Sequence, residues 1–251
     1  MTSPERITID IPDSRSREAV LHRPPPDRAT GRAVVIIHDA TGFRRDTERH
    51  CERFAAEGYV ALAPDLYAGL NPGCIVRVIQ SMRTHDGEAY AVIDAARRAL
   101  ASDADVDEAR IGVIGFCMGG GFALCSAADQ PFAVAAPFYG HVPKDRHRLK
   151  GLCPVLAQYG AKDMMFAPHA QRLAGHLAAL DVDHEVVMHD GVGHSFMNAH
   201  TDLYSTVGRY FPPLYGGYHE PTEADAWQRV LAFFNKHLGS SSLGSGRSEG
   251  S

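Results

Sequence analysis

Short apolar segments alternate with longer amphipathic segments along most of this chain, and this alternation constrains the fold more than any other feature. The apolar segments are rich in β-branched and small residues, as buried strands are, whereas the segments between them have helical spacing. Strands that alternate with helices build βαβ units, in which helices cover both faces of a mostly parallel sheet. The sequence therefore predicts an α/β fold.

The expected elements follow from the same patterns. Strands are expected at residues 6–11, 17–22, 32–37, 59–66, 110–116, 132–140, 153–160 and 184–190. Helices are expected at residues 46–59, 88–103, 119–129, 168–180 and 223–238. The first two strands read as an antiparallel pair, and the apolar run at 32–37 reads as a strand that is buried on both faces.

The domain organisation is expected to be simple. Residues 1–238 contain no repeat and no internal linker, and a chain of 251 residues can bury one large core. We therefore expect a single domain over 1–238. Residues 239–251 are rich in Gly and Ser, which predicts a disordered tail.

Charge and cysteine content narrow the possible partners and compartments. The formal net charge is −5 and no block of Lys and Arg stands out, which argues against nucleic acid or a membrane as a partner. The N-terminus lacks the apolar core of a secretory signal, and the apolar runs are too short to cross a bilayer. Five cysteines without a C-x-x-C pair fit a reducing compartment. We expect a cytoplasmic monomer or small homo-oligomer.

No cofactor or metal is expected. The 14 histidines are scattered, and no H-E-x-x-H motif or Cys/His cluster has the spacing of a metal site. The glycines between residues 112 and 121 never form the G-x-G-x-x-G pattern of dinucleotide-binding proteins. The glycines of this segment therefore need another explanation.

Cys117 lies between Gly115 and Gly119, at the point where a predicted core strand gives way to a helix. A sharp strand-to-helix turn forces its apex residue into a strained conformation and requires small residues two positions away. The segment therefore matches the G-x-S-x-G nucleophile elbow with Cys in place of Ser. A helix N-terminus also favours the nucleophilic thiolate. The alternative is a buried cysteine in a glycine-rich packing turn.

Two later residues are candidate partners of this thiol. A nucleophile on such a turn is followed along the chain by an acid and then by a histidine. Asp163 follows the strand predicted at 153–160, and His194 lies in a glycine loop after the strand predicted at 184–190. Both therefore lie at the sheet edge where Cys117 lies. His194 would act as base and acid, and Asp163 would fix its tautomer. Alternatively, they are an ordinary turn aspartate and loop histidine.

An oxyanion produced at Cys117 would need two backbone N–H groups. One should come from Met118, the residue after the nucleophile, and the other from the loop after the strand at 32–37. We expect the Ala40 N–H to be this second donor. Asp39 lies in the same loop, and from the residues alone it reads as a plain turn residue.

These segments together resemble the dienelactone hydrolase family of α/β-hydrolases, over about residues 5–238. The resemblance rests on HDATGF, APDLY, IGFCMGGGFAL, YGAKD, GVGHSFMN and EADAWQRVLAFF. It implies the α/β-hydrolase fold and a Cys-His-Asp triad made of Cys117, His194 and Asp163. It also implies that an acid in the first oxyanion loop holds the thiol neutral at rest and takes the thiol proton when substrate binds.

The sequence departs from the family pattern at two positions. The gating acid of the family is typically glutamate, and the matching residue is Asp39, one methylene shorter. Members that cleave dienelactone carry an arginine four residues after the histidine, where this chain has Asn198. A second carboxylate-binding arginine is implied before the helix at 88–103, and Arg77 is the nearest match. Tyr139, at a strand end, could line the pocket or be a core tyrosine.

The sequence thus predicts an enzyme that hydrolyses a small-molecule carboxylic ester or lactone through a thioester on Cys117. Because Asn198 brings no charge, neutral substrates are expected to react at least as well as anionic lactones. One alternative is an acyl transferase or thioesterase with the same triad. The other is a non-catalytic small-molecule receptor on the same fold, which would need no activated thiol.

Overall fold

The structure is a computed structural model that describes residues 4–12, 16–67, 78, 80–81, 86–199, 212–213 and 215–239. Three features of the sequence lie outside these residues. They are Arg77, Cys74 and the Gly/Ser-rich tail beyond Gly239.

Eight strands form one sheet. They are β1 (Glu5–Ile9), β2 (Arg17–His22), β3 (Arg32–Ile37), β4 (Tyr59–Pro64), β5 (Ile111–Phe116), β6 (Val134–Phe138), β7 (Val155–Gly160) and β8 (His184–His189). Their order in the sheet is β1-β2-β4-β3-β5-β6-β7-β8. β2 pairs antiparallel with β1 and with β4, and all the other neighbours are parallel. The predicted mostly parallel sheet with an antiparallel start is confirmed.

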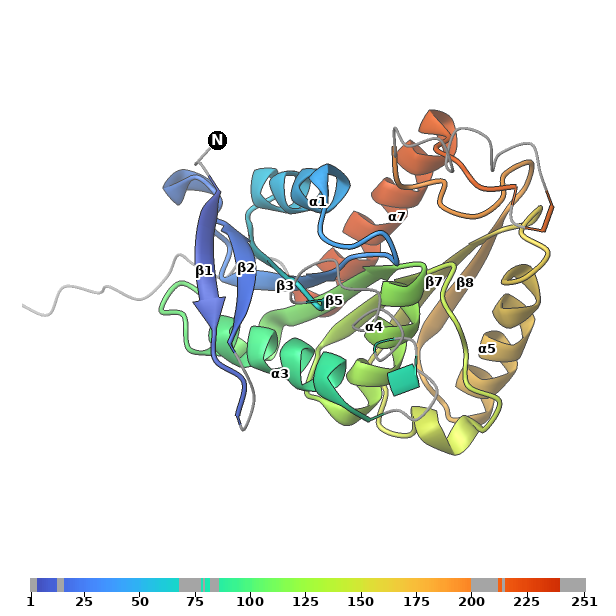
Figure 1. The fold of residues 1–251 in the computed structure, drawn as a ribbon, viewed down its shortest axis with the longest axis horizontal. Helices are drawn as coiled ribbons and strands as arrows, with labels where there is room; N and C mark the ends of the chain where they lie inside the picture. The colour runs from blue at the N-terminus through green and yellow to red at the C-terminus, as the bar shows by residue number, and fades with distance from the viewer. Residues whose placement is uncertain are drawn as a thin grey trace, which may run out of the picture.

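In the described residues, five long helices cover the sheet. They are α1 (Arg45–Ala56), α3 (Glu88–Ala101), α4 (Met118–Asp129), α5 (Ala167–Ala179) and α7 (Glu220–Leu238), and short 3₁₀ turns lie at Pro26–Arg28, Glu108–Arg110 and Arg146–Leu149. Figure 1 shows α1 and α7 on one face of the sheet and α3, α4 and α5 on the other. The α/β fold is therefore confirmed. No helix of the described ranges is long and apolar enough to cross a membrane.

Helix boundaries differ from the predicted ones by a few residues, for local reasons. α1 ends at Ala56 because Gly58, with φ +88°, turns the chain directly into β4. α7 begins three residues earlier than predicted because the His219 side chain accepts a hydrogen bond from the Thr222 N–H and Pro221 occupies the first turn. Both differences arise from the chemistry of helix ends, which hydrophobic spacing does not report.

The core lies on both faces of the central strands. Every residue of β3, β4, β5, β6 and β7 is buried, which explains why these strands have continuous apolar runs. On the face covered by α1 and α7, Phe54 packs edge-on against Trp227 at a ring distance of 4.7 Å and against Tyr59 at 5.4 Å. These contacts fasten α1 to the sheet and to α7.

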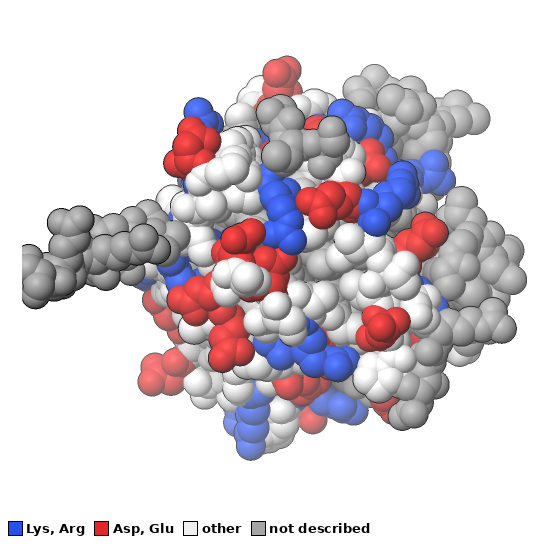
Figure 2. All heavy atoms as spheres, turned by 90° about the vertical axis from the view of Figure 1, so that its left-hand side faces the viewer, with Lys and Arg blue, Asp and Glu red and all other residues white. Residues whose placement is uncertain are grey.

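The surface at the β1–β2 end of the molecule carries both signs of charge. Figure 2 shows acidic and basic side chains interspersed over this face. Ion pairs join several of them, including Arg23 with Asp103 at 2.5 Å and Arg45 with Glu52 at 3.0 Å. This face therefore has no broad field of one sign.

Candidate active site

Cys117 occupies the turn between β5 and α4, in an unusual backbone conformation. Its φ and ψ are 56° and −116°, values that residues other than glycine rarely adopt. A Cβ on Gly115 would lie 2.1 Å from the carbonyl oxygen of Gly119, and a Cβ on Gly119 would lie 2.5 Å from the carbonyl oxygens of Ile37 and His38. Both glycines are thus required by close backbone contacts, and the turn has the geometry that their spacing predicts.

His194 and Asp163 lie beside this turn and hydrogen bond to each other. The His194 Nδ1 atom is 2.6 Å from the Asp163 Oδ2 atom, and the imidazole also hydrogen bonds to the Cys117 thiol. Asp163 is fully buried, and its Oδ1 atom accepts from the N–H groups of Met165 and Phe166. Since a carboxylate only accepts, Nδ1 carries a proton and Nε2 is left for the thiol.

The surroundings of His194 stabilise the charged form that pairs with a Cys117 thiolate, and they fix its ring. Burial by itself lowers the pKa of His194, but the thiolate charge of Cys117 and the hydrogen bonds to Asp163 and Cys117 outweigh it and raise the pKa to about 10. The ring packs between Tyr139 at 4.8 Å and Phe166 at 4.9 Å. Tyr139 is fully buried, so the structure places it behind the histidine.

Two backbone N–H groups near Cys117 are free to bind an oxyanion. Met118 begins α4, and Ala40 lies in the loop after β3. Within the described ranges, neither N–H donates a hydrogen bond to another protein group. The Tyr67 hydroxyl joins the two segments, since it donates to the Ala40 carbonyl at 3.1 Å and lies 3.4 Å from the Met118 sulfur.

The loop after β3 is also held from inside by His38, which the sequence analysis did not single out. The Leu66 N–H donates to His38 Nε2 at 3.1 Å, so Nδ1 carries the proton and donates to the Asp39 carbonyl at 2.8 Å. Burial lowers the pKa of His38, which favours this neutral form. His38 is the first residue of the segment HDATGF, which contributed to the family resemblance. In the structure it supports the loop through backbone groups.

Asp39 accepts hydrogen bonds from Thr41 and Asn198. Its Oδ1 atom accepts from the Thr41 N–H at 2.8 Å and from the Thr41 hydroxyl at 2.6 Å, and its Oδ2 atom accepts from the Asn198 side-chain amide at 2.7 Å. Asp39 and Asn198 are 5% and 4% exposed. The Asn198 amide is thus directed at a protein carboxylate.

A second buried histidine, which the sequence analysis missed, stands behind Asn198. His50 on α1 is 1% exposed, and its Nε2 atom lies 3.2 Å from the Asn198 Oδ1 atom. Its ring stacks on Phe116, the residue before Cys117, at 4.3 Å and 16°. The contact joins residues 148 positions apart, so no local pattern could have indicated it.

The other described cysteines lie in different surroundings. Burial raises the pKa of the Cys125 and Cys153 thiols to about 12, and it raises the pKa of Cys51 as well. All four described cysteines are free, and Cys125 is buried in α4. Among these four, Cys117 alone hydrogen bonds to a histidine.

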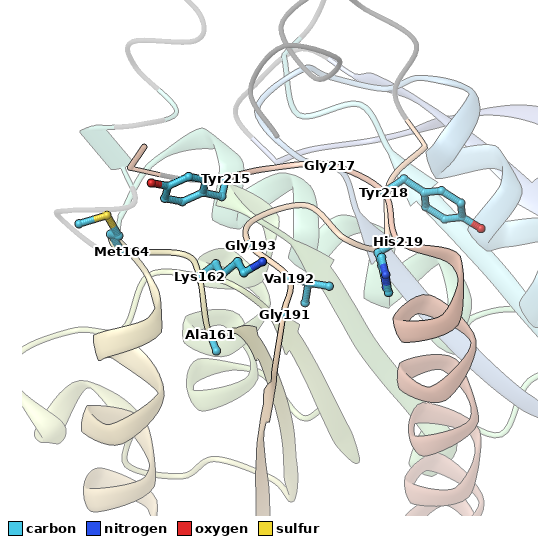
Figure 3. Close-up of a pocket in the computed structure, with 10 residues that line it drawn as sticks. All are labelled: Ala161, Lys162, Met164, Gly191, Val192, Gly193, Tyr215, Gly217, Tyr218 and His219. Atoms are coloured by element: carbon cyan, nitrogen blue, oxygen red, sulfur yellow. The ribbon is translucent and has the colours of Figure 1, made fainter. Parts of the chain in front are cut away.

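A pocket of about 590 Å³ opens next to the acid and histidine loops (Figure 3). Three segments line it, after β7, after β8 and before α7. The lining residues are Ala161, Lys162, Met164, Gly191, Val192, Gly193, Tyr215, Gly217, Tyr218 and His219. Figure 3 shows Lys162 between the first two loops, with Tyr215 above it. The Gly217 N–H donates to the His194 carbonyl at 2.8 Å, so the segment 215–219 supports the histidine loop. Neither Cys117 nor Ala40 lines this pocket.

Metal ligands are also not assembled in the part of the chain that the structure describes. No group of three or more His, Cys, Asp or Glu side chains there is arranged to hold a metal ion.

Comparison with known protein families gives a match over most of the chain. The model of the dienelactone hydrolase family matches residues 18–238. The chain belongs to the dienelactone hydrolase family. This confirms the resemblance read from the motifs and makes the protein a hydrolase.

Individual relatives in the dienelactone hydrolase family are distant. A carboxymethylenebutenolidase of Rhodococcus opacus is 27% identical over 230 residues, which are 84% of each chain. Protein usf of Aquifex pyrophilus is 29% identical over 223 residues, which are 83% of this chain and 89% of the relative.

Solved structures show the same fold. A dienelactone hydrolase-like promiscuous phosphotriesterase from metagenomic libraries has a TM-score of 0.79 and 22% identity, and the match covers 95% of this chain and all of the other. A dienelactone hydrolase of Anabaena variabilis has a TM-score of 0.64 and 18% identity, over 94% and 99% of the two chains. At such identities the similarity shows the α/β-hydrolase fold.

Proposed function

We propose that the protein hydrolyses a small carboxylic ester or lactone through a thioester on Cys117, with His194 and Asp163 as the other members of a catalytic triad. One observation carries the proposal. The strained turn presents the Cys117 thiol to an imidazole that is itself held by a buried carboxylate 2.6 Å away. This is the arrangement of an activated nucleophile, its base and the group that orients the base.

Acylation would proceed in two steps. The thiol proton is transferred to His194, and the Cys117 sulfur attacks the carbonyl carbon to form a tetrahedral intermediate. The Met118 and Ala40 N–H groups hold its negative oxygen. The carbon–oxygen bond to the leaving group then breaks, His194 gives its proton to the leaving oxygen, and the acyl group remains on Cys117 as a thioester.

Deacylation would reverse the roles. His194 takes a proton from water, and the resulting hydroxide attacks the thioester. The carbon–sulfur bond then breaks, and His194 gives its proton to the leaving sulfur. The products are a carboxylic acid and the free thiol. In a lactone the acid and the alcohol are parts of one molecule, so hydrolysis opens the ring.

Asp39 would control the first proton transfer. Its carboxylate lies in the oxyanion loop, where three donors favour the ionised form. At rest this charge disfavours a second negative charge on Cys117. When substrate fills the site, the carboxylate accepts the thiol proton and passes it to His194.

The proposed substrates are neutral. Asn198 carries no charge, and its amide already donates to Asp39. An arginine at this position would offer a substrate carboxylate a permanently charged fork. We therefore expect a similar or higher kcat/KM for a neutral lactone than for its carboxylate-bearing counterpart. A preference for the anion above about tenfold would contradict this part of the proposal.

The proposed chemistry also favours a cytoplasmic location. A nucleophilic thiol has to stay reduced, and the cytoplasm keeps cysteines reduced. The four described cysteines are free. Cell fractionation with antibodies against the protein would test this, and recovery from an oxidising compartment would contradict it.

Hydrolysis of p-nitrophenyl acetate separates the candidate functions. The wild-type protein should release p-nitrophenol catalytically, and Cys117→Ala should not. Cys125→Ala, inside the helix that follows Cys117, should keep most of the activity. A receptor would show no catalytic turnover. An acyl transferase would transfer the acetyl group to an added alcohol or thiol faster than to water. Turnover that survives Cys117→Ala would overturn the proposed function.

A further inference from the structure

One face of α1 holds the segment 197–199 that follows His194. The Asp46 carboxylate accepts from the Ala199 N–H at 3.0 Å, and the Arg49 guanidinium donates to the Met197 carbonyl at 2.6 Å. His50, on the same face, contacts Asn198 between them. Residues 49 and 50 lie about one helical turn after residue 46, so all three are on one face of α1. This face therefore fixes the consecutive residues 197–199.

The direction of each hydrogen bond between His50 and Asp39 follows from chemistry. The Asp39 carboxylate only accepts, so the Asn198 amide nitrogen faces it. The amide oxygen then faces His50, whose Nε2 atom therefore carries the proton and donates. The chain of donors thus runs from His50 through Asn198 to Asp39.

Burying the His50 imidazole costs free energy that an apolar side chain would not. Burial lowers its pKa to about 3, with a smaller contribution from the charge of Arg49, so the ring is neutral in the folded protein. Its Nδ1 atom has no hydrogen-bond partner among the described residues. An apolar side chain stacked on Phe116 would avoid the loss of hydration that this nitrogen suffers. What His50 alone supplies here is the Nε2–H donor to Asn198.

We propose that His50 is a positioning residue that fixes the side-chain amide of Asn198, so that the amide nitrogen holds the Asp39 carboxylate beside the nucleophile. This inference rests on the proposed function of Cys117 and Asp39. Without the His50 donor, the Asn198 amide is free to rotate and to present its oxygen to Asp39. The Asp39 Oδ2 atom then loses the Asn198 donor, while the hydrogen bonds from Thr41 to Oδ1 remain.

The variants follow from the geometry. His50→Phe keeps a ring stacked on Phe116 and removes the donor. His50→Gln keeps an N–H donor near the original Nε2 position. Asn198→Leu removes the amide and tests the same connection if His50→Phe does not fold. Cys51→Ala, next to His50 on α1 and equally buried, controls for a simple loss of packing.

The first measurement is the single-turnover rate of acylation by p-nitrophenyl acetate. His50→Phe should slow it by about fivefold to thirtyfold. This is less than the roughly tenfold to hundredfold expected for complete loss of a hydrogen bond to a charged group, because the Asn198 nitrogen still faces Asp39 part of the time. In an Asp39→Asn background the same substitution should change the rate by less than about twofold, because the group it positions is gone. His50→Gln should restore the rate to within about threefold of the wild type, and Cys51→Ala should leave it near wild type. An equal effect of His50→Phe in both backgrounds would overturn the proposal.

A second measurement needs no ester. Alkylation of Cys117 by iodoacetamide should be faster in Asp39→Asn and in His50→Phe, since both displace the negative charge near the thiol, and the double variant should be no faster than Asp39→Asn. Alkylation that His50→Phe leaves unchanged would contradict the proposal, whatever the protein does with esters. Ester turnover that survives Cys117→Ala would instead overturn the proposed function, so the two failures are distinguishable.

Discussion

Two loops at the same edge of the sheet place their functional groups in different ways. The loop after β5 carries Cys117 and the loop after β3 carries Asp39, and the two strands are neighbours in the sheet. Cys117 is placed by the backbone, through a left-handed φ and two glycines packed against carbonyl oxygens. Asp39 is placed by side-chain hydrogen bonds from Thr41 and from the distant Asn198.

The difference sets how each loop responds to change. Steric placement is stiff, because a single added methyl group overlaps backbone atoms that cannot move independently. Placement by hydrogen bonds is graded, because each donor contributes about 0.5–3 kcal/mol and the others remain when one is removed. We expect large effects at the elbow and smaller, graded effects at Asp39.

The largest effect should come from the thiol and its base. Cys117→Ala and His194→Ala should each lower kcat by roughly 10⁴-fold or more, because each member of a triad depends on the others. The double variant should be no worse than either single variant. Steady-state hydrolysis of p-nitrophenyl acetate measures this, and losses that add in the double variant would show that the two residues act independently.

Substitution of a glycine in the elbow tests steric placement. Gly115→Ala should lower the free energy of unfolding by about 3 kcal/mol or more, because its Cβ would meet the Gly119 carbonyl. Gly175→Ala, inside α5, is the matched control. A Cβ on Gly175 would meet no atom within 4 Å, so this variant should raise the free energy of unfolding by about 1 kcal/mol. Urea unfolding of both variants provides the comparison. A near-neutral Gly115→Ala would refute the stiffness attributed to the elbow.

Asp39 should show the graded response. Asp39→Asn should slow single-turnover acylation by about tenfold to a hundredfold, since it removes the proposed proton acceptor. Thr41→Val removes one of the three donors and should have a smaller effect, of about fivefold. Both variants should keep the wild-type free energy of unfolding to within about 2 kcal/mol. An unchanged acylation rate in Asp39→Asn would return Asp39 to the role of an ordinary turn residue.

The last prediction concerns His50, which supports Asn198 and Asp39, and the pH dependence of the free energy of unfolding. The pKa of His50 is lowered in the folded state, so unfolded chains bind a proton that folded chains do not between about pH 6.5 and pH 3. The contribution of His50 to stability is fully present above pH 6.5 and is lost as the pH falls through this window. The slope approaches 1.4 kcal/mol per pH unit. Stability measured against pH should be flatter in His50→Gln than in the wild type, and equal slopes would contradict the neutral state of His50.

The difference between the two loops also determines which of their features could be predicted from the sequence. The elbow was predictable because Gly115, Cys117 and Gly119 are close in sequence and their spacing reports a local steric requirement. The strands and helices were predictable because burial on both faces leaves continuous apolar runs, as in β3. The proximity of Asp163 and His194 was predictable because parallel strands end at one edge of the sheet.

The support of Asp39 could not be predicted in the same way. Asn198 was noticed, but its amide could face a substrate or a protein group, and only the packing of α1 against the segment 197–199 decides between them. His50 occupies a position whose helical spacing reads as core. Hydrogen bonds between segments almost 150 residues apart leave no periodic signal in a single sequence.

The central claim is that Cys117 forms a covalent acyl-enzyme, and trapping that intermediate tests it most directly. The wild-type protein would be mixed with p-nitrophenyl acetate, quenched in acid within the first turnover, digested and examined by mass spectrometry. The account predicts one acetyl group on the peptide that contains Cys117, and none on that peptide in Cys117→Ala. Turnover without an acetyl group on Cys117, or with the acetyl group on another residue during turnover, would contradict the account.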